Sequence, residues 1–544
     1  MKSESMTGKP VPRIGEVLTG TVREVTHGLM RAFDMTTVFG NPGSTEMKFF
    51  REWPDDFRYV LGLQESVVVA MADGHAQATR RAAFVNLHSA AGVGHALGSI
   101  FTAWRNHTPL VITAGQQTRA MFPTDPYLYA YEAAEFPKPY VKWSIEPARA
   151  ADVPAAIQRA YHIAMQRPRG PVFVSVPEDD WDAPSEPLEL RRVDTDFAPP
   201  VDALEELASA LRQAKRPVIV AGASVDMDDA WEGLVALAER LGAVVWASPM
   251  VGRCGFPEDH RLFAGHLPPL RQPLADCLAP HDLVLVVGAP VFTYHVHTGG
   301  EFLKPGTALW LLTDDPQEAA RAATGRAIAG SLKPALDGLR RGTGEGPARE
   351  SSGRSARAEP LPVDPITGNY LMASIDRLMP DDAIVVEEAP THRNALWEHL
   401  RVRRPGSFYA ASSGGLGWAV AAAPGVALAA PGRRVICIVG DGSALFGIQA
   451  LWTAAQWRLP ITFLVFNNRG YGALRSFGRL MGVADAPGHD IGELDFAALA
   501  RGFGCETLQI ASAAEVETVF RTAFAALHPT VVDVQLDAGA VKLY

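Results

Sequence analysis

The sequence predicts an α/β protein made of three doubly wound parallel-sheet domains in series. Short continuous runs of Val, Ile and Leu alternate with longer amphipathic stretches along nearly the whole chain. This pattern is typical of parallel strands that are buried on both faces and separated by helices. With 544 residues, the chain is also too long for a single hydrophobic core. We therefore expect several α/β units rather than one large sheet.

Apolar runs of strand length occur from one end of the chain to the other. They are residues 37–39, 83–87, 110–113, 172–176, 218–221, 283–287, 308–312, 383–386, 435–439, 462–466 and 531–534. Stretches of helical length lie between them, among them residues 67–78 and 444–456. This alternation predicts sheets that carry helices on both faces.

Two segments without hydrophobic periodicity divide the chain. Residues 178–200 are rich in Pro, Asp and Glu, and residues 341–365 are rich in Gly, Ser, Arg and Pro. Such compositions are typical of exposed connections between domains. The predicted units are an N-terminal domain of residues 1–195, a middle domain of residues 196–345, a linker of residues 346–365 and a C-terminal domain of residues 366–544.

Charge and cysteine content exclude several classes of function. The net charge is −10, which argues against a nucleic-acid partner because phosphate binding needs a basic face. Four cysteines lie far apart, which predicts neither a disulfide framework nor a structural zinc site and favours the cytoplasm. The first thirteen residues are polar, and Gly and Pro interrupt the longest uncharged stretch, residues 405–432. We therefore expect no signal peptide and no membrane span.

Two motifs that follow neighbouring strands carry the strongest functional signal. Gly-Asp-Gly-Ser stands at residues 440–443, and Asn-Asn-Arg-Gly stands at residues 467–470. Both should lie at the carboxyl edge of one parallel sheet, so we expect Asp441 and Asn468 to meet there. Their oxygen atoms suit Mg²⁺ or Ca²⁺, and small residues at a helix start suit a phosphate. A lone Gly-Asp-Gly is usually a plain turn, but the following Asn pair favours a cation and diphosphate site.

The paired motifs resemble those of the thiamin-diphosphate-dependent 2-oxo acid decarboxylase superfamily, in particular its benzoylformate decarboxylase branch. The resemblance covers nearly the whole chain after about Gly20. The blocks that carry it are residues 38–46, 61–77, 86–92, 113–121, 288–295, 414–417 and 471–475. It implies decarboxylation of an aromatic 2-oxo acid to the aldehyde and CO₂. The alternative is a carboligase or decarboxylase of the same superfamily that acts on aliphatic 2-oxo acids or aldehydes.

The resemblance also implies roles for individual residues. Glu65 would activate the pyrimidine ring, His88 and His295 would transfer protons, and Ser44 would bind the substrate carboxylate. Without the resemblance, Glu65 would be a helix-start carboxylate, His88 a core histidine and Ser44 a turn residue. His295 and His297 have a spacing that also fits a metal site on a strand.

For the cofactor, the resemblance implies that Asp441, Asn468 and the Gly470 carbonyl bind a Mg²⁺ or Ca²⁺ ion that holds the diphosphate. Leu416 would support the thiazolium ring. The remaining cofactor contacts would be Asn41, Gly43, Glu388, Thr391, Gly415, Gly442, Ser443, Tyr471 and Gly472.

Three segments depart from the pattern of the family. Glu-Ala-Pro-Thr at residues 388–391 replaces Glu-Ser-Thr-Ser, and a Gly-x-Gly-Asn motif ends here in His95. A leucine pair that walls the substrate pocket aligns with Tyr127 and Leu128, inside the changed segment 122–135. The expected pocket residues are Tyr127, Leu128, Ala473 and Phe477.

The partners expected from the sequence are a small 2-oxo acid or aldehyde and further copies of the chain. The resemblance implies active sites between chains and a homo-oligomer, a dimer of dimers. The strand at residues 218–221 is followed by Gly-Ala-Ser-Val without a Gly-x-Gly-x-x-Gly motif. We therefore expect no FAD, and a nicotinamide dehydrogenase is disfavoured.

Overall fold

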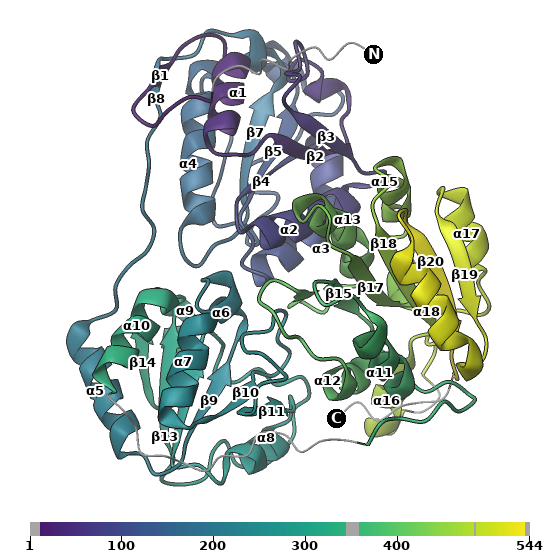
Figure 1. The fold of residues 1–544 in the computed structure, drawn as a ribbon. Helices are drawn as coiled ribbons and strands as arrows, with labels where there is room; N and C mark the ends of the chain where they lie inside the picture. The colour runs from purple at the N-terminus through teal and green to yellow at the C-terminus, as the bar shows by residue number, and fades with distance from the viewer. Residues whose placement is uncertain (1–10, 344–357, 484–485, 539–544) are drawn as a thin grey trace.

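The computed structural model describes residues 11–343, 358–483 and 486–538, which form three α/β domains (Figure 1). Each domain contains a six-stranded sheet in which all neighbouring strands are parallel. Separate clusters of buried apolar side chains pack on the two faces of the middle sheet and of the C-terminal sheet. The predicted fold class is therefore confirmed. Among the described residues, no helix is both long enough and apolar enough to cross a lipid bilayer.

The N-terminal sheet has the strand order β3-β2-β4-β5-β7-β6. Its strands are β2 (Thr37–Gly40), β3 (Arg58–Leu61), β4 (Ala83–Leu87), β5 (Leu110–Gln116), β6 (Ser144–Ile145) and β7 (Val172–Pro177). Its helices are α1 (Val22–Ala32), α2 (Glu65–Thr79), α3 (Ser89–Arg105) and α4 (Val153–Met165). A separate antiparallel ribbon pairs β1 (Val17–Leu18) with β8 (Leu188–Glu189).

The middle sheet has the order β11-β10-β9-β12-β13-β14. Its strands are β9 (Pro217–Ala221), β10 (Val244–Ala247), β11 (Phe263–His266), β12 (Leu283–Val287), β13 (Ala308–Thr313) and β14 (Arg326–Ala329). Its helices are α5 (Val201–Gln213), α6 (Ala223–Met227), α7 (Trp231–Leu241), α8 (Arg271–Leu278), α9 (Pro316–Arg321) and α10 (Leu332–Gly342).

The C-terminal sheet has the order β16-β15-β17-β18-β20-β19. Its strands are β15 (Ile384–Glu388), β16 (Phe408–Ala410), β17 (Val435–Gly440), β18 (Ile461–Asn467), β19 (Glu506–Ile510) and β20 (Thr530–Gln535). Its helices are α11 (Gly368–Leu378), α12 (Arg393–His399), α13 (Trp418–Ala429), α14 (Asp441–Ala444), α15 (Ala450–Gln456), α16 (Gly472–Leu480), α17 (Phe496–Gly502) and α18 (Val516–Ala525).

One predicted helix is divided in the structure. The stretch expected to be helical over residues 444–456 becomes the short α14 and the separate α15. Between them, Phe446 and Gly447 make turn-type bonds, donating to the carbonyls three residues earlier. Gly447 passes so close to the Gly417 carbonyl that a Cβ there would lie 2.5 Å from it. Tertiary contact with the Gly417 segment therefore accompanies the interruption of the helix.

The domain limits given above stay a proposal. The three sheets lie within the three proposed domains, from β2 to β7, from β9 to β14 and from β15 to β20. Most of the proposed linker, residues 346–357, lies outside the described residues.

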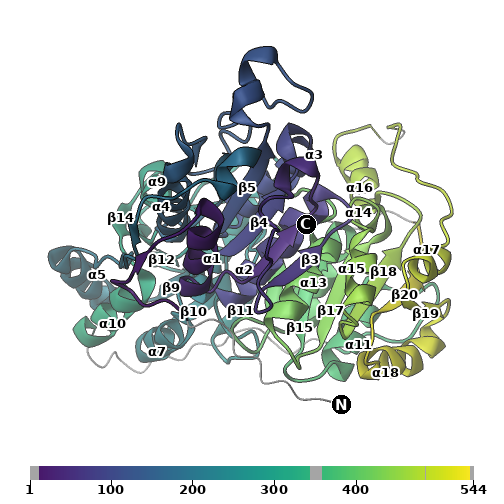
Figure 2. The same ribbon diagram turned by 90° about the horizontal axis from the view of Figure 1, so that it is seen from above.

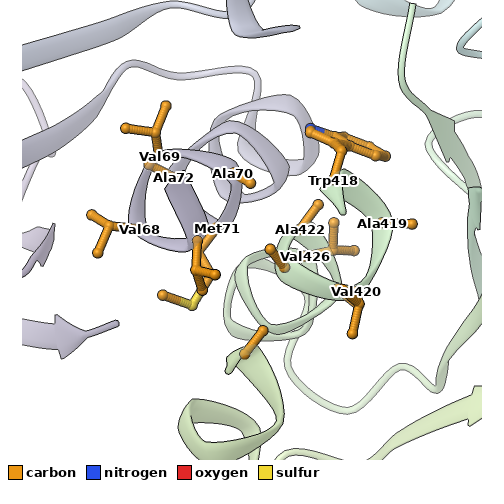
Figure 3. Packing of buried hydrophobic residues seen from close by; sticks show 14 of the residues in the cluster. Val68, Val69, Ala70, Met71, Ala72, Trp418, Ala419, Val420, Ala422 and Val426 are labelled. Atoms are coloured by element: carbon orange, nitrogen blue, oxygen red, sulfur yellow. The ribbon is translucent and has the colours of Figure 1, made fainter. Parts of the chain in front are cut away.

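The N-terminal and C-terminal domains meet through α2 and α13, which pack directly on each other (Figure 3). Small residues permit this close approach. A Cβ at Gly425 would overlap the carbonyl of Met71, and a Cβ at Gly74 would overlap the carbonyl of Ala422. Apolar side chains of both helices belong to one buried cluster. The two domains therefore share a continuous core.

A buried carboxylate stabilises the same contact. Asp73 on α2 accepts hydrogen bonds from the indole N–H of Trp418 on α13 (2.7 Å) and from Asn106 and Thr108 after α3 (2.8 and 2.6 Å). Burial raises the pKa of Asp73, and these donors oppose that shift. Because an unpaired buried carboxylate is costly, this set of bonds favours one arrangement of the three helices.

We predict that Gly425→Ala destabilises the protein by roughly 1–3 kcal/mol, because the added Cβ forces α13 away from α2. Gly502→Ala is the matched control, since its Cβ would meet no atom within 4 Å. Thermal melting of both variants at one scan rate checks this. Equal melting temperatures for Gly425→Ala and wild type would contradict the packing described here.

Candidate active site

The N-terminal domain brings three predicted residues to one edge of its sheet. Gly40, the last residue of β2, lies opposite Leu61 of β3 and Asn86 of β4. The chain continues from these strand ends to Ser44, Glu65 and His88. All three predicted catalytic residues of this domain therefore follow the carboxyl edge of one parallel sheet, as expected.

His88 is held by a carboxylate that the sequence analysis did not single out. Its Nδ1 lies 2.9 Å from Oε2 of Glu46, whose side chain is 1% exposed. Glu46 also accepts hydrogen bonds from the backbone N–H groups of Gly43 (2.7 Å) and Gly115 (2.9 Å). The bond to Glu46 raises the pKa of His88. The arrangement directs Nδ1 to Glu46 and leaves Nε2 of His88 for another partner.

Gly43 makes room for this histidine. A Cβ at Gly43 would overlap the imidazole ring of His88, so a larger residue would displace the ring from Glu46. Ser44 begins the 3-10 turn Ser44–Glu46 and is exposed beside this pair. Asn41, expected to contact the cofactor, donates its backbone N–H to the Asn86 carbonyl (3.3 Å).

Glu65 is the first residue of α2, and its side chain is 13% exposed. Its Oε2 lies 3.1 Å from Nδ1 of His95 on α3. Its Oε1 lies next to Gly92, where a Cβ would approach it to 3.3 Å. The carboxylate is thus partly enclosed, with one oxygen bonded and the other beside a residue that has no side chain.

In the C-terminal domain, Asp441 and Asn468 follow two neighbouring strands. Gly440 of β17 pairs with Phe466 of β18, so the residues that follow these strands lie side by side. Asp441 accepts hydrogen bonds from the N–H groups of Gly442 (2.7 Å) and Gly470 (3.0 Å). Burial raises the pKa of the Asp441 carboxyl.

The donor atoms at this edge fit a hard divalent cation. Oδ1 of Asn468 is buried and has no hydrogen-bond partner among the described residues. A buried amide oxygen without a partner is costly, and a cation would satisfy it. No group of three or more His, Cys, Asp or Glu side chains in the described part of the chain could hold a metal ion. An ion here would therefore depend on Asp441, Asn468 and the backbone.

Glycines line the space around these ligands. A Cβ at Gly442 would lie 2.5 Å from the Tyr471 ring, and a Cβ at Gly472 would lie 2.5 Å from Nδ2 of Asn468. Thr391, another expected cofactor contact, also lies against Gly472. Ser443 lies beside Asp441 in the short α14 and is buried. Predicted contacts for the diphosphate thus converge at this edge.

Glu388 stabilises the loop that carries Leu416. Its carboxylate accepts hydrogen bonds from the backbone N–H groups of Gly417 (2.6 Å) and Ala419 (2.8 Å) at the start of α13. Burial raises the pKa of Glu388 to about 7, and these two donors oppose the shift. Gly415 donates its N–H to Ser413 (3.0 Å), while Leu416 itself remains 37% exposed.

His295 reaches this group from the middle domain. Its imidazole packs edge-on against Phe477 of α16, with ring centroids 4.9 Å apart. Burial lowers the pKa of His295, and the positive charge of Arg393 lowers it further. Ala473 lies one turn before Phe477 on the same helix. One predicted pocket residue, Phe477, therefore contacts His295, and another, Ala473, lies one helical turn from Phe477.

The predicted pocket residues of the N-terminal domain lie on its surface. The blue segment that follows β5 projects from the body of the chain (Figure 2). In it, the side chain of Tyr127 is 87% exposed. Its neighbour Leu128 has a positive φ of 68°, and its carbonyl accepts a hydrogen bond from Ser89 next to His88 (2.9 Å). Their roles as pocket residues stay a prediction.

The N-terminal and C-terminal groups are separated within one chain. The contacts of Met71 with Gly425 and of Gly74 with Ala422 show that α2 and α13 run antiparallel. Measured along the axis of α2, Glu65 lies about 13 Å from Gly74, on one side of this contact. Leu416 precedes α13 and lies on the other side. Glu65 and Leu416 therefore lie at opposite ends of the contact between α2 and α13.

Comparison with known proteins also distinguishes an N-terminal from a C-terminal cofactor-binding domain. Models of thiamine pyrophosphate enzymes match residues 20–130 (N-terminal TPP binding domain), 204–339 (central domain) and 389–534 (C-terminal TPP binding domain). The chain is 44% identical to a benzoylformate decarboxylase of Pseudomonas aeruginosa, over 94% of this chain and 98% of that protein.

Two solved structures resemble the whole chain. One is the benzoylformate decarboxylase of Polynucleobacter necessarius, with a TM-score of 0.93 and 38% identity, covering 96% of this chain and 99% of that one. The other is the 4-hydroxybenzoylformate decarboxylase of Rhodococcus jostii, with a TM-score of 0.92 and 42% identity, covering 95% and 99%. The chain therefore belongs to the thiamine pyrophosphate enzymes, in the group that includes the benzoylformate decarboxylases.

Proposed function

We propose that this protein decarboxylates an aromatic 2-oxo acid of the benzoylformate type to the aldehyde and CO₂, with thiamin diphosphate as its cofactor. The observation that supports the proposal is that the chain contains the residues of both halves of the site, one in the N-terminal and one in the C-terminal domain. Glu65 and His88 lie at one sheet edge, and Asp441 and Asn468 lie at another. Two of the relatives that match along nearly the whole chain, at 44% and 42% identity, are decarboxylases of benzoylformate and 4-hydroxybenzoylformate.

The C-terminal site would hold the cofactor through a divalent ion. Asp441, Asn468 and the Gly470 carbonyl are the proposed ligands, and Mg²⁺ or Ca²⁺ suits their oxygen atoms. When bound, thiamin diphosphate would supply a nucleophilic carbon for the keto group and a thiazolium ring that can accept the electron pair left by CO₂. Glu388 would keep Leu416 in place below that ring by holding the backbone of Gly417.

The two histidines are suited to opposite proton transfers. The hydrogen bond to Glu46 raises the pKa of His88, which favours the protonated ring, and Nε2 is then the nitrogen that can donate a proton. Burial lowers the pKa of His295, so this ring is neutral and can accept a proton. Groups whose environments move their pKa values apart can share acid and base roles in one site. Ser44 beside His88 is the proposed hydrogen-bond donor to the substrate carboxylate.

We propose that each active site is built from two chains. This proposal is supported by the positions of Glu65 and Leu416, which lie at opposite ends of the packed helices α2 and α13. Glu65, His88 and Ser44 of one chain would face His295, Leu416 and the cation site of another. A dimer with twofold symmetry, doubled to a tetramer, completes two such sites per pair of chains.

The middle domain is proposed to bind no FAD. The turn after β9 uses its backbone donors internally, since the Ser224 N–H donates to the Gly288 carbonyl (3.2 Å). A Cβ at Gly222 would overlap this same carbonyl, so the turns after β9 and β12 touch. Support also comes from the sequence after β9, which lacks the Gly-x-Gly-x-x-Gly motif that brings a helix N-terminus close to a pyrophosphate. We also propose the cytoplasm as the compartment, in keeping with four free cysteines.

The substrate panel that tests the proposal contains benzoylformate, 4-hydroxybenzoylformate and pyruvate. Purified protein with thiamin diphosphate and Mg²⁺ should release the aromatic aldehydes and CO₂, and mass spectrometry identifies the products. Phe477, Ala473 and Leu128 would contact the ring, and Tyr127 would narrow the pocket or add a hydroxyl group near the ring. Coupling of aliphatic acids or aldehydes without turnover of any aryl acid would instead support the carboligase.

Asp441→Ala should lower the affinity for thiamin diphosphate roughly 100-fold or more, because the diphosphate is held largely through the ion. Asp202→Ala, at an exposed carboxylate on α5, is the control and should bind like wild type. Calorimetric titration of both variants in the presence of Mg²⁺ gives the comparison. Wild-type affinity in Asp441→Ala would defeat the proposed cation site.

Mixing a Glu65→Gln chain with an Asp441→Ala chain should restore activity that neither variant has alone. If sites form between chains and mixing is random, about a quarter of the sites combine two intact halves. Differently tagged chains establish that subunits have exchanged. No recovery after proven exchange would mean that each site is built within one chain.

The two histidines predict a rate maximum around neutral pH. His88, with its raised pKa, loses its proton only above the ordinary value of 6.5, so the rate should fall as the pH rises further. His295, with its lowered pKa, gains a proton only below 6.5, so the rate should also fall at acid pH.

Replacing Glu46 should shift only one of the two limbs of this pH–rate profile. Glu46→Gln should move the alkaline limb to lower pH because the bond that raises the pKa of His88 is weakened. The acid limb should stay in place. Glu146→Gln is the control, since Glu146 bonds Ser175 and Gln116 and neither histidine. Rates of benzoylformate turnover from about pH 5 to pH 9 provide the test; an unmoved alkaline limb would contradict the role of Glu46.

A further inference from the structure

His95 contacts the carboxylate proposed to activate the cofactor. It lies on α3, and its Nδ1 is 3.1 Å from Oε2 of Glu65. The imidazole is 64% exposed, whereas Glu65 is 13% exposed. An exposed histidine contributes little to the core, so this contact bears mainly on the glutamate. His95 also occupies the position at which the motif of the family ends in Asn.

The two oxygens of Glu65 have different surroundings. Oε2 is paired with His95, while Oε1 lies beside Gly92, where even a Cβ would approach it to 3.3 Å. A carboxylate oxygen accepts, so Nδ1 of His95 carries the proton of this bond. The histidine therefore fixes the rotation of the carboxylate and leaves Oε1 accessible for a second partner.

We propose that His95 is a positioning residue for Glu65 that promotes activation of the cofactor, an inference that rests on the proposed function. In that activation the O–H bond of the Glu65 carboxyl breaks, and its proton moves to the pyrimidine ring nitrogen. The electron pair stays on Glu65 as a carboxylate. A hydrogen bond from His95 is stronger to the carboxylate than to the neutral acid, so it favours this transfer.

Three variants of His95 distinguish the effect of its hydrogen bond to Glu65 from the effect of the rest of the imidazole ring. The side-chain N–H of Asn occupies nearly the position of Nδ1 in His, whereas that of Gln corresponds to Nε2. His95→Asn therefore keeps the donor to Glu65, while His95→Gln and His95→Ala remove it. Because His95 lies outside the hydrophobic core of its own chain, all three variants should fold. They should also bind thiamin diphosphate like wild type, because His95 contacts Glu65 and not the proposed cation ligands.

The test is the rate at which the C2 proton of bound thiamin diphosphate exchanges with D₂O, followed by acid quench and NMR on the holoenzyme without substrate. We expect roughly tenfold slower exchange in His95→Ala and His95→Gln, and near wild-type exchange in His95→Asn. Calorimetric titration should show unchanged cofactor affinity in all three.

Two results would overturn the proposal: wild-type exchange in His95→Ala, or exchange in His95→Asn as slow as in His95→Ala. Glu65→Gln is measured alongside and should exchange far more slowly than any of these variants. Exchange in Glu65→Gln as fast as in wild type would contradict the assignment of Glu65 itself, and the inference would fall with it. Failure of decarboxylation with intact exchange would concern only the proposed substrate.

Discussion

The close packing of α2 against α13 is the constraint on which the arrangement of the active site depends. Gly74 and Gly425 let the two backbones touch, and Asp73 fixes the contact through the Trp418 indole. Each helix begins at a functional element, α2 at Glu65 and α13 just after Leu416. Because the helices run antiparallel, the packing that joins the two domains also holds these elements apart. The separation that favours sites between chains is thus a consequence of the core.

The two halves of the site are held by different physical means. In the N-terminal half, side chains pair with side chains: Glu46 holds His88, and His95 contacts Glu65. In the C-terminal half, the backbone provides the hydrogen-bond donors, since glycine N–H groups donate to Asp441 and Glu388. This difference fits the proposed tasks. Proton transfer needs groups whose pKa values are adjusted, whereas a diphosphate and its ion need close backbone approach.

Much of the fold, and the position of Asp441 and Asn468 at one sheet edge, was predictable from sequence because the signals are local. Val, Ile and Leu runs mark the strands, and Asp441 and Asn468 follow two of them directly. The contact of Glu46 with His88 was not predictable, because the two residues are far apart in the sequence and only the sheet brings them together. The break before α15 likewise follows from contact with Gly417. The exposure of Tyr127 also depends on tertiary structure, so its role in the pocket stays a prediction.

A crystal structure with thiamin diphosphate and Mg²⁺ would show whether the two halves carried by one chain bind different cofactor molecules. We expect the ion to lie on Asp441 and Asn468 of one chain. We expect the carboxylate nearest the pyrimidine ring to be Glu65 of the partner chain. A structure in which Glu65 and Asp441 of the same chain contact one cofactor would contradict this expectation.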